Sequence, residues 1–233
     1  MEKFTFKIVD SPQLLEEVFK LRFQVYAQER HFIKEEDYPD GKEKDKFDAY
    51  SIHFVAIDDQ GEIAGAVRLV LNSPLGFPLE EHSQGALFIK KDKLPRQNLA
   101  EISRLVISKN YRRRKGDGLY YSLPVEDDPS EGKFSRRTRP MVFGLYRLIY
   151  QESKRRGITF WYAAMEDVLY RLLKAHGFSF FPIGREIEYF GKVKPYLGII
   201  EDIERNVQIT RPDYYRYFTE GLEPHLLPTS DIL

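Results

Sequence analysis

The chain has 233 residues, of which 42% are apolar and 14% aromatic, enough for one sizeable core and too few for two, so we expect a single domain over residues 1–233. Basic and acidic residues number 36 each, which argues against a nucleic-acid partner attracted by overall charge. The absence of cysteine excludes a disulfide framework, a thiolate metal site and a cysteine nucleophile.

The first half of the chain contains four segments with clear periodicity. They predict a strand, a helix and the two strands of a hairpin, at residues 4–9, 11–30, 52–58 and 62–72 respectively. Pro12 suits the first turn of the helix, and the sequence Asp-Gln-Gly between the last two segments suits a tight turn.

The second half opens with a loop at residues 73–98, a strand at 101–108 and an inserted basic loop at about 109–139. A helix is predicted to begin near Thr138 and Pro140 and to end at Gly157. The remaining periodic segments predict a strand, a helix that ends at Gly177, and two further strands, at residues 158–164, 165–176, 178–183 and 186–191. This order predicts an α/β (α+β) fold with a mixed sheet flanked by helices.

Three charged residues interrupt strands that otherwise suit a core. Arg68 is the charge within an apolar strand, and Glu101 and Arg104 share the next strand. Buried charges need partners. Side chains alternate along a strand, so residues three apart face opposite ways unless a bulge redirects one of them. We therefore expect a bulge in this strand, or two separate sets of partners.

Further charged residues lie on the first helix and after it. Arg22 and Tyr26 are four residues apart and so share one side of the helix, and Glu43, Asp45 and Asp48 form a carboxylate cluster. These groups converge on one functional cleft, or they form a structural ion-pair network with an arginine at the core edge and a solvated acidic turn. Spacing alone leaves both interpretations open.

The inserted loop contains possible phosphate ligands. Arg113, Gly116 and Gly118 have the spacing R-x-x-G-x-G, whose backbone N–H groups can approach phosphate oxygens. Arg137 and Arg139 lie just before the predicted helix start and offer an alternative cluster. A basic loop without a ligand explains the same residues equally well.

Other signals are negative. The N-terminus lacks the pattern of a signal peptide, and no window approaches the roughly 18 uncharged apolar residues that span a bilayer, which predicts a cytoplasmic protein without a transmembrane segment. The five histidines show no metal-binding spacing, so we expect no metal site.

Together these residues resemble the GNAT-fold N-acyltransferases, specifically the autoinducer-synthase branch of acyl-homoserine-lactone synthases and long-chain N-acyl amino acid synthases. The resemblance covers residues 14–200 and rests on ordered motif positions: Arg22, Tyr26, Phe32, Glu43, Asp45, Asp48, Arg68, Glu101, Ser103 and Arg104. The segments LRFQVYAQERHF, DYPDG, DKFDAYSIHFVA and IGREIEYFGKVKPY are similar to acyltransferases associated with PEP-CTERM/exosortase systems.

The resemblance implies a mostly antiparallel GNAT-like sheet and transfer of a fatty acyl group to the amine of a small polar acceptor such as an amino acid. The donor would be an acyl-phosphopantetheine thioester, on acyl carrier protein or coenzyme A, with no permanently bound cofactor. Glu101 is then the expected base, and Ser103 and Arg104 complete the catalytic strand. The other matched residues bind the acceptor, with Asp45 and Asp48 positioning its amine.

One departure affects the donor. In ordinary GNAT acetyltransferases the pyrophosphate loop leads directly into its helix, whereas about 20 residues follow Gly118 here. We therefore favour acyl carrier protein as the partner. A coenzyme A-dependent N-acetyltransferase and a relative that binds acyl groups without turnover are the alternatives.

Overall fold

The computed structural model describes residues 4–90, 93–111 and 135–228. Its strands are β1 (Thr5–Ile8), β2 (Ser51–Ile57), β3 (Ile63–Leu71), β4 (Leu99–Ile107), β5 (Phe160–Met165), β6 (Phe180–Pro182), β7 (Ile187–Glu188) and β8 (Lys192–Ile199). They form one sheet in the order β1-β2-β3-β4-β5-β8-β6, with β7 paired to β8. The β4–β5 pair is parallel and the other pairs are antiparallel, which gives the mostly antiparallel mixed sheet that was expected.

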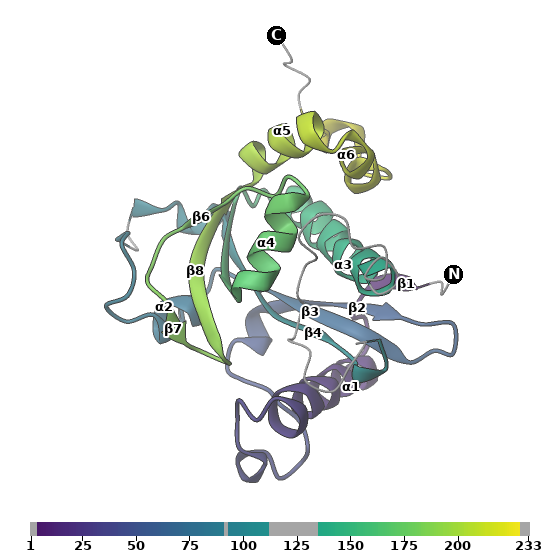
Figure 1. The fold of residues 1–233 in the computed structure, drawn as a ribbon, viewed down its shortest axis with the longest axis vertical. Helices are drawn as coiled ribbons and strands as arrows, with labels where there is room; N and C mark the ends of the chain where they lie inside the picture. The colour runs from purple at the N-terminus through teal and green to yellow at the C-terminus, as the bar shows by residue number, and fades with distance from the viewer. Residues whose placement is uncertain (1–3, 91–92, 112–134, 229–233) are drawn as a thin grey trace.

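Helices cover both faces of the sheet. They are α1 (Pro12–Phe23), α2 (Pro78–His82), α3 (Ser135–Arg155), α4 (Asp167–Ala175), α5 (Ile200–Thr210) and α6 (Pro212–Thr219). Helix α1 lies on one face, α3 and α4 lie on the other, and α5 and α6 pack beyond α3 (Figure 1). Within the described residues, no helix is long and apolar enough to cross a membrane.

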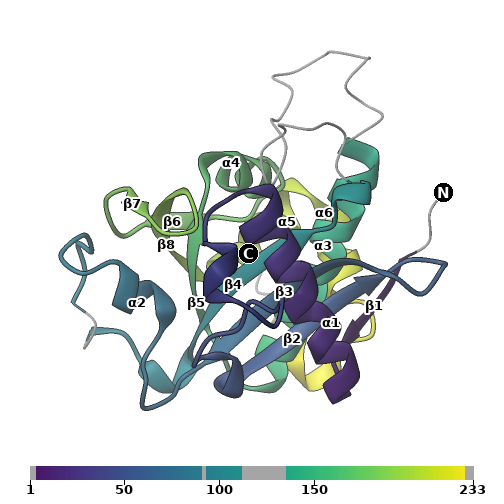
Figure 2. The same ribbon diagram turned by 90° about the horizontal axis from the view of Figure 1, so that it is seen from below.

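Two segments cover the face of the sheet on which α1 lies. Figure 2 shows α1 lying across β3 and β4, while the segment with α2 lies beside β5. Each segment packs on the sheet through its own apolar cluster. Val18, Val25 and Tyr26 belong to the cluster of the first segment, and Phe77, Leu79 and Tyr162 belong to the cluster of the α2 segment. The candidate active site lies where these two segments meet.

Most of the predicted elements are confirmed. Helix α1 continues as a π-helix at Gln24–Glu29, and the sequence did not indicate α2, β8, α5 or α6. Strand β8 contains Pro195, a residue that normally argues against an interior strand. Pro195 nevertheless lies opposite Ala164 of β5, and its carbonyl accepts a hydrogen bond from the Ile183 N–H.

The predicted start of the long helix is wrong. Helix α3 begins at Ser135, so Pro140 lies inside the helix. The last five residues of the loop predicted at 109–139 therefore belong to the helix. Proline has no N–H, and the helix therefore lacks one backbone hydrogen bond at this point. Residues 112–134 of the predicted loop lie outside the described residues.

The bulge expected in β4 is confirmed. Between the pairs Ala66–Val106 and Arg68–Ser103, strand β3 has one residue and β4 has two. Arg104 takes a left-handed conformation with φ of 53°, which is rare for a residue with a side chain. The extra residue restores Leu105 to the core face, so Glu101, Ser103 and Arg104 all project toward the α1 face.

Two helices end at glycines, as predicted. The two glycines differ in the space that is available around their Cα atoms. Gly157 and Gly177 have φ of 65° and 87°, and the following N–H groups, of Ile158 and Phe178, bond back to the helix carbonyls of Ser153 and Leu173. A Cβ at Gly157 would meet open space. A Cβ at Gly177 would lie 2.6 Å from Thr210 Oγ1 and 3.2 Å from Val207 Cα.

We predict that Gly177→Ala lowers the free energy of unfolding by about 2–4 kcal/mol, since it adds a clash with α5 to the left-handed strain. Gly157→Ala, the matched control, should cost only about 1 kcal/mol, the strain alone. Urea denaturation of the two variants measures both values. Equal losses would contradict close packing of α5 against the end of α4.

Candidate active site

A small cleft opens where β4 and β5 part. The two strands pair in parallel from Leu99 with Phe160 to Ile102 with Ala163, and no further. Beyond this point the bulge turns β4 away while β5 continues along β8. The resulting cavity of about 50 Å³ has room for a few water molecules. Four predicted residues, Tyr26, Glu101, Ser103 and Arg104, line it.

Glu101 is the buried carboxyl of this cleft. Its Oε2 accepts a hydrogen bond from the Leu79 N–H at 2.8 Å. Its buried Oε1 has no hydrogen-bond partner among the described residues. Burial raises the pKa of Glu101 to about 8, although the Leu79 N–H and the charges of Arg68 and Arg104 oppose this rise. Glu101 therefore exchanges its proton near neutral pH.

Arg22 joins α1 to the acidic loop. Its Nε donates to Glu43, and its Nη1 and Nη2 donate to the two oxygens of Asp48 at 2.7 and 3.2 Å. The side chains of Arg22 and Glu43 are each 1% exposed. The Glu43 N–H also bonds to the Phe19 carbonyl of α1. The loop is therefore held to the helix by side chains and backbone together.

Arg68 connects the same loop to β3 and β4. Its Nη1 donates to Asp45 and Asp48, both at 2.7 Å, and its Nε donates to Ser103 Oγ at 3.1 Å. Its buried Nη2 has no partner within the described part of the chain. In the strand register Arg68 lies opposite Ser103, two residues from Glu101. The unpartnered donor and the unpartnered Glu101 oxygen therefore lie on the same face of adjacent strands.

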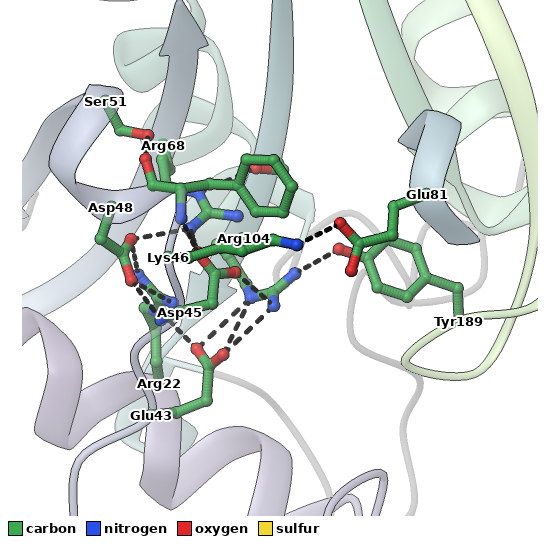
Figure 3. Close-up of polar contacts among 12 residues, drawn as sticks. Arg22, Glu43, Asp45, Lys46, Asp48, Ser51, Arg68, Glu81, Arg104 and Tyr189 are labelled. Atoms are coloured by element: carbon green, nitrogen blue, oxygen red, sulfur yellow. Dashed lines mark hydrogen bonds and ion pairs between the residues drawn. The ribbon is translucent and has the colours of Figure 1, made fainter. Parts of the chain in front are cut away.

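Arg104 completes the network from the bulge. It donates to Glu43 through Nε and Nη2, to Asp45 through Nη2 at 3.0 Å, and to Tyr189 Oη through Nη1 at 2.8 Å. Figure 3 shows the three arginines converging on the three carboxylates of the loop. Formal charges of three arginines and three carboxylates cancel, so the cluster is buried without net charge.

The charges shift the acidity of the carboxylates strongly. Burial alone would raise the pKa of Glu43, but Arg104 and Arg22 overcome it and lower the pKa to about 2. Burial is likewise overcome at Asp48, where Arg22 and Arg68 lower the pKa to about 2. Asp45 is 23% exposed and is the most accessible of the three carboxylates. These groups stay ionised at physiological pH, in contrast to Glu101.

Aromatic side chains enclose the Arg104 guanidinium. The rings of Phe190, Tyr189 and Tyr26 have their centres 4.0, 5.6 and 5.8 Å from its central carbon. Tyr26 and Phe190 also contact each other, with ring centres 4.9 Å apart. Phe32 packs behind Tyr26. The predicted aromatic residues thus support Arg104 from the α1 side, and the turn after β7 supports it from the other.

The structure brings together ten predicted site residues from four parts of the chain: Arg22, Tyr26, Phe32, Glu43, Asp45, Asp48, Arg68, Glu101, Ser103 and Arg104. The predicted phosphate ligands Arg113, Gly116 and Gly118 lie outside the described residues. Arg137 and Arg139 lie in the first turns of α3 rather than in a loop before it.

The sequence did not single out three residues at the cleft. Tyr189 lies in the turn after β7 and Glu166 directly after β5, and both line the cavity. The ring of His82 stacks on Tyr189 at 4.0 Å between ring centres. Tyr189 falls within the motif IGREIEYFGKVKPY, so the sequence contained a signal for it without a role. Glu166 and His82 lacked any local signal.

The family model of the acetyltransferase (GNAT) domain matches residues 21–122, which include the end of α1, the acidic loop, β2, β3 and β4. The solved structures extend this likeness to nearly the whole chain. TofI, in a ternary complex with an inhibitor and MTA, is 18% identical with a TM-score of 0.63, over 95% of this chain and 99% of that one. The protein has the GNAT fold.

Two other structures with this fold are those of enzymes that synthesise acylated products. BjaI, a CoA-dependent acyl-homoserine lactone synthase solved with SAM and isopentyl-CoA, is 17% identical with a TM-score of 0.62, over 94% of this chain and 90% of that one. FeeM, an N-acyl amino acid synthase from uncultured soil microbes, is 11% identical with a TM-score of 0.57, over 91% and 98%. A search of the curated proteins found no match. The expected GNAT fold is confirmed.

We predict that Arg104→Ala lowers the free energy of unfolding by about 3–5 kcal/mol, because it leaves Glu43 and Asp45 buried with one cation fewer. Arg205→Ala is the matched control: Arg205 pairs with Glu201 on the surface at 62% exposure, and its loss should cost less than about 1 kcal/mol. Urea denaturation at neutral pH measures both. A loss of similar size in the two variants would contradict the buried network.

Proposed function

We propose that the protein is an N-acyltransferase that transfers a fatty acyl group from a phosphopantetheine thioester to the amine of a small polar acceptor such as an amino acid. The observation that carries this proposal is Glu101, a buried carboxyl with one unpartnered oxygen in the cleft between β4 and β5. The likeness to BjaI and FeeM supports the reaction class. A cytoplasmic location and an association with PEP-CTERM/exosortase systems belong to the same proposal.

The proposed chemistry uses Glu101 as the general base. The acceptor nitrogen attacks the thioester carbon, so a C–N bond forms and the C–S bond breaks. Glu101 removes one proton from the ammonium, directly or through a water, before the nitrogen attacks. The second proton that the nitrogen loses as the amide forms passes to the leaving thiolate. A pKa of about 8 suits this task, since a base is most effective when its pKa lies near the working pH.

The ion-pair network would form the wall of the acceptor site. Both Asp48 oxygens are engaged by arginines, so Asp48 acts on the acceptor amine through its charge alone. Asp45 is more exposed and is the carboxylate better placed to face the amine. Arg22, Tyr26 and Phe32 would close the pocket from the α1 side. Arg68 holds Ser103 and both aspartates in place.

We favour acyl carrier protein as the donor. The phosphopantetheine arm would run along β4, with its phosphate near the start of α3, where Arg137 and Arg139 lie. Carrier proteins are acidic, so the basic residues of this region, with Arg113 and the glycines Gly116 and Gly118 before them, suit electrostatic docking. Coenzyme A carries the same arm and is the alternative donor.

A coenzyme A-dependent N-acetyltransferase is the second candidate, because the matching family model is that of an acetyltransferase domain. The third is a relative that binds acyl groups without turnover. The experiment incubates the purified chain with pooled amino acids and one of three donors: long-chain acyl carrier protein, long-chain acyl coenzyme A or acetyl coenzyme A. Mass spectrometry then detects N-acyl products.

We expect long-chain N-acyl products, formed faster with the carrier-protein donor. Faster product formation from long-chain acyl coenzyme A would overturn the donor assignment alone. N-acetyl products without long-chain products would support the second candidate. No product with any donor would rule out the proposed transfer and favour the third.

We predict that Glu101→Gln lowers kcat about 10²- to 10⁴-fold, since the amide cannot take the amine proton. Glu201→Gln makes the same chemical change on the surface of α5 and should leave the rate unchanged. The wild-type rate should rise as the pH approaches about 8, where the carboxylate form of Glu101 becomes dominant. Initial rates from pH 6 to 9 measure this limb. A Glu101→Gln rate equal to wild type would remove Glu101 as the base.

Stability provides the folding control for this variant. The pKa of Glu101 is raised in the folded state, so its stabilising effect is present below the unfolded value of about 4.5 and is lost as the pH rises through about 8. Glutamine stays neutral throughout. The melting temperature of Glu101→Gln should therefore match or exceed that of wild type above pH 8. A lower melting temperature there would indicate that the carboxylate is stabilising and contradict its raised pKa.

A further inference from the structure

The turn after β7 places a tyrosine hydroxyl in the cleft to which the proposed chemistry gives no role. Tyr189 lies between β7 and β8 in sequence and beside Arg104 in the lining of the cavity. Its side chain is buried, and its Oη accepts a hydrogen bond from Arg104 Nη1 at 2.8 Å. The group is therefore fixed at the wall that the network forms on the acceptor side.

The proton of this hydroxyl is available to a ligand. A guanidinium only donates hydrogen bonds, so Tyr189 Oη is the acceptor toward Arg104 and its own O–H points elsewhere. Within the described ranges, the structure records no protein acceptor for that O–H. Burial raises the pKa of Tyr189, and the nearby Glu101 adds to the rise, so the phenol stays protonated. The hydroxyl is thus a donor that Arg104 polarises.

The surrounding contacts hold the ring in one orientation. His82 of α2 stacks on it with 16° between the ring planes. The next two residues of the turn, Phe190 and Gly191, have left-handed φ values of 51° and 96°. Phe190 packs on Tyr26, and a Cβ at Gly191 would lie 2.9 Å from Phe32. A strained turn fixed on both sides is typical of a residue that must keep its position.

We propose that the Tyr189 hydroxyl donates a hydrogen bond to the carboxylate of the acceptor and so selects amino acids over simple amines. This inference rests on the proposed function and specifies its acceptor. Glu101 and Arg104 are three residues apart on one face of β4, with Tyr189 bound to Arg104. Glu101 and Tyr189 line the same cavity, so an α-amino acid bound there can turn its amine toward Glu101 and its carboxylate toward Tyr189.

Selectivity for amino acids follows because an acceptor without a carboxylate offers no partner to the Tyr189 hydroxyl. A simple amine would leave the buried Tyr189 O–H without a partner. Sites built to bind a polar group discriminate strongly against analogues that lack it, because the buried donor then loses its hydrogen bond. A hydrogen bond to a charged group accounts for about 10- to 100-fold in affinity.

The test compares matched acceptors in wild type and Tyr189→Phe. The pairs are leucine with 3-methylbutylamine and phenylalanine with 2-phenylethylamine, which differ only in the carboxylate. We expect Tyr189→Phe to raise KM for the amino acids about 10- to 100-fold with little change in kcat, and to leave the amines unchanged. Tyr217→Phe removes a hydroxyl from α6, where Tyr217 packs on Arg147, and serves as the matched control.

Binding measurements separate this inference from the proposed function. Isothermal titration with the same acceptors, without donor, should show amino acids binding wild type more tightly than Tyr189→Phe even if no acyl transfer occurs. Equal binding of the amino acid and its amine to wild type would overturn the inference. An equal loss for both acceptors in Tyr189→Phe would overturn it too, since the hydroxyl would then serve the amine or the thioester.

Discussion

The bulge at Arg104 is the constraint on which the site depends. One extra residue in β4 projects an acid, a hydroxyl and a guanidinium from one face, where strict alternation would send Arg104 into the α3 core. The same residue ends the pairing of β4 with β5 and opens the cleft. The left-handed backbone at Arg104 has a cost, and the ion pairs with Glu43 and Asp45 offset it. The ion pairs of Arg104 therefore stabilise the bulge, and the bulge in turn places Arg104 where these ion pairs can form.

The two interpretations of the charged residues, structural network and functional cleft, are compatible. Arg22, Glu43 and Asp48 are nearly inaccessible and hold α1, the acidic loop and β3 together. Glu101 and Tyr189 lie at the margin of this network and line the cleft, and Asp45 is its most exposed carboxylate. The buried ion pairs thus form a rigid support, and the few groups that can react are held in position on it, as in a preorganised active site.

Much of this arrangement could be predicted from the sequence, because buried charges are conspicuous in apolar strands. Arg68, Glu101 and Arg104 predicted an ion-pair network or a functional cleft, and the spacing of Glu101 and Arg104 predicted a bulge or two separate sets of partners. The partners of each arginine could not be predicted, since Glu43 meets Arg104 across 61 residues of sequence. Strand β8 was not predicted, and its Pro195 is a residue that argues against an interior strand. Tyr189 was missed because its role depends on a neighbour 85 residues away.

The charge balance of the network also limits how the protein can change over evolution. Removing one of the six charges leaves a buried partner, at a cost of about 3–5 kcal/mol out of a typical total of about 5–15. Viable substitutions in the network must therefore occur in compensating pairs. Tyr189 and Glu166 line the cleft outside this set of six charges, so a substitution at either leaves none of the six without its partner. New acceptor preferences should arise at these margins by single substitutions, while the arginine–carboxylate set stays constant.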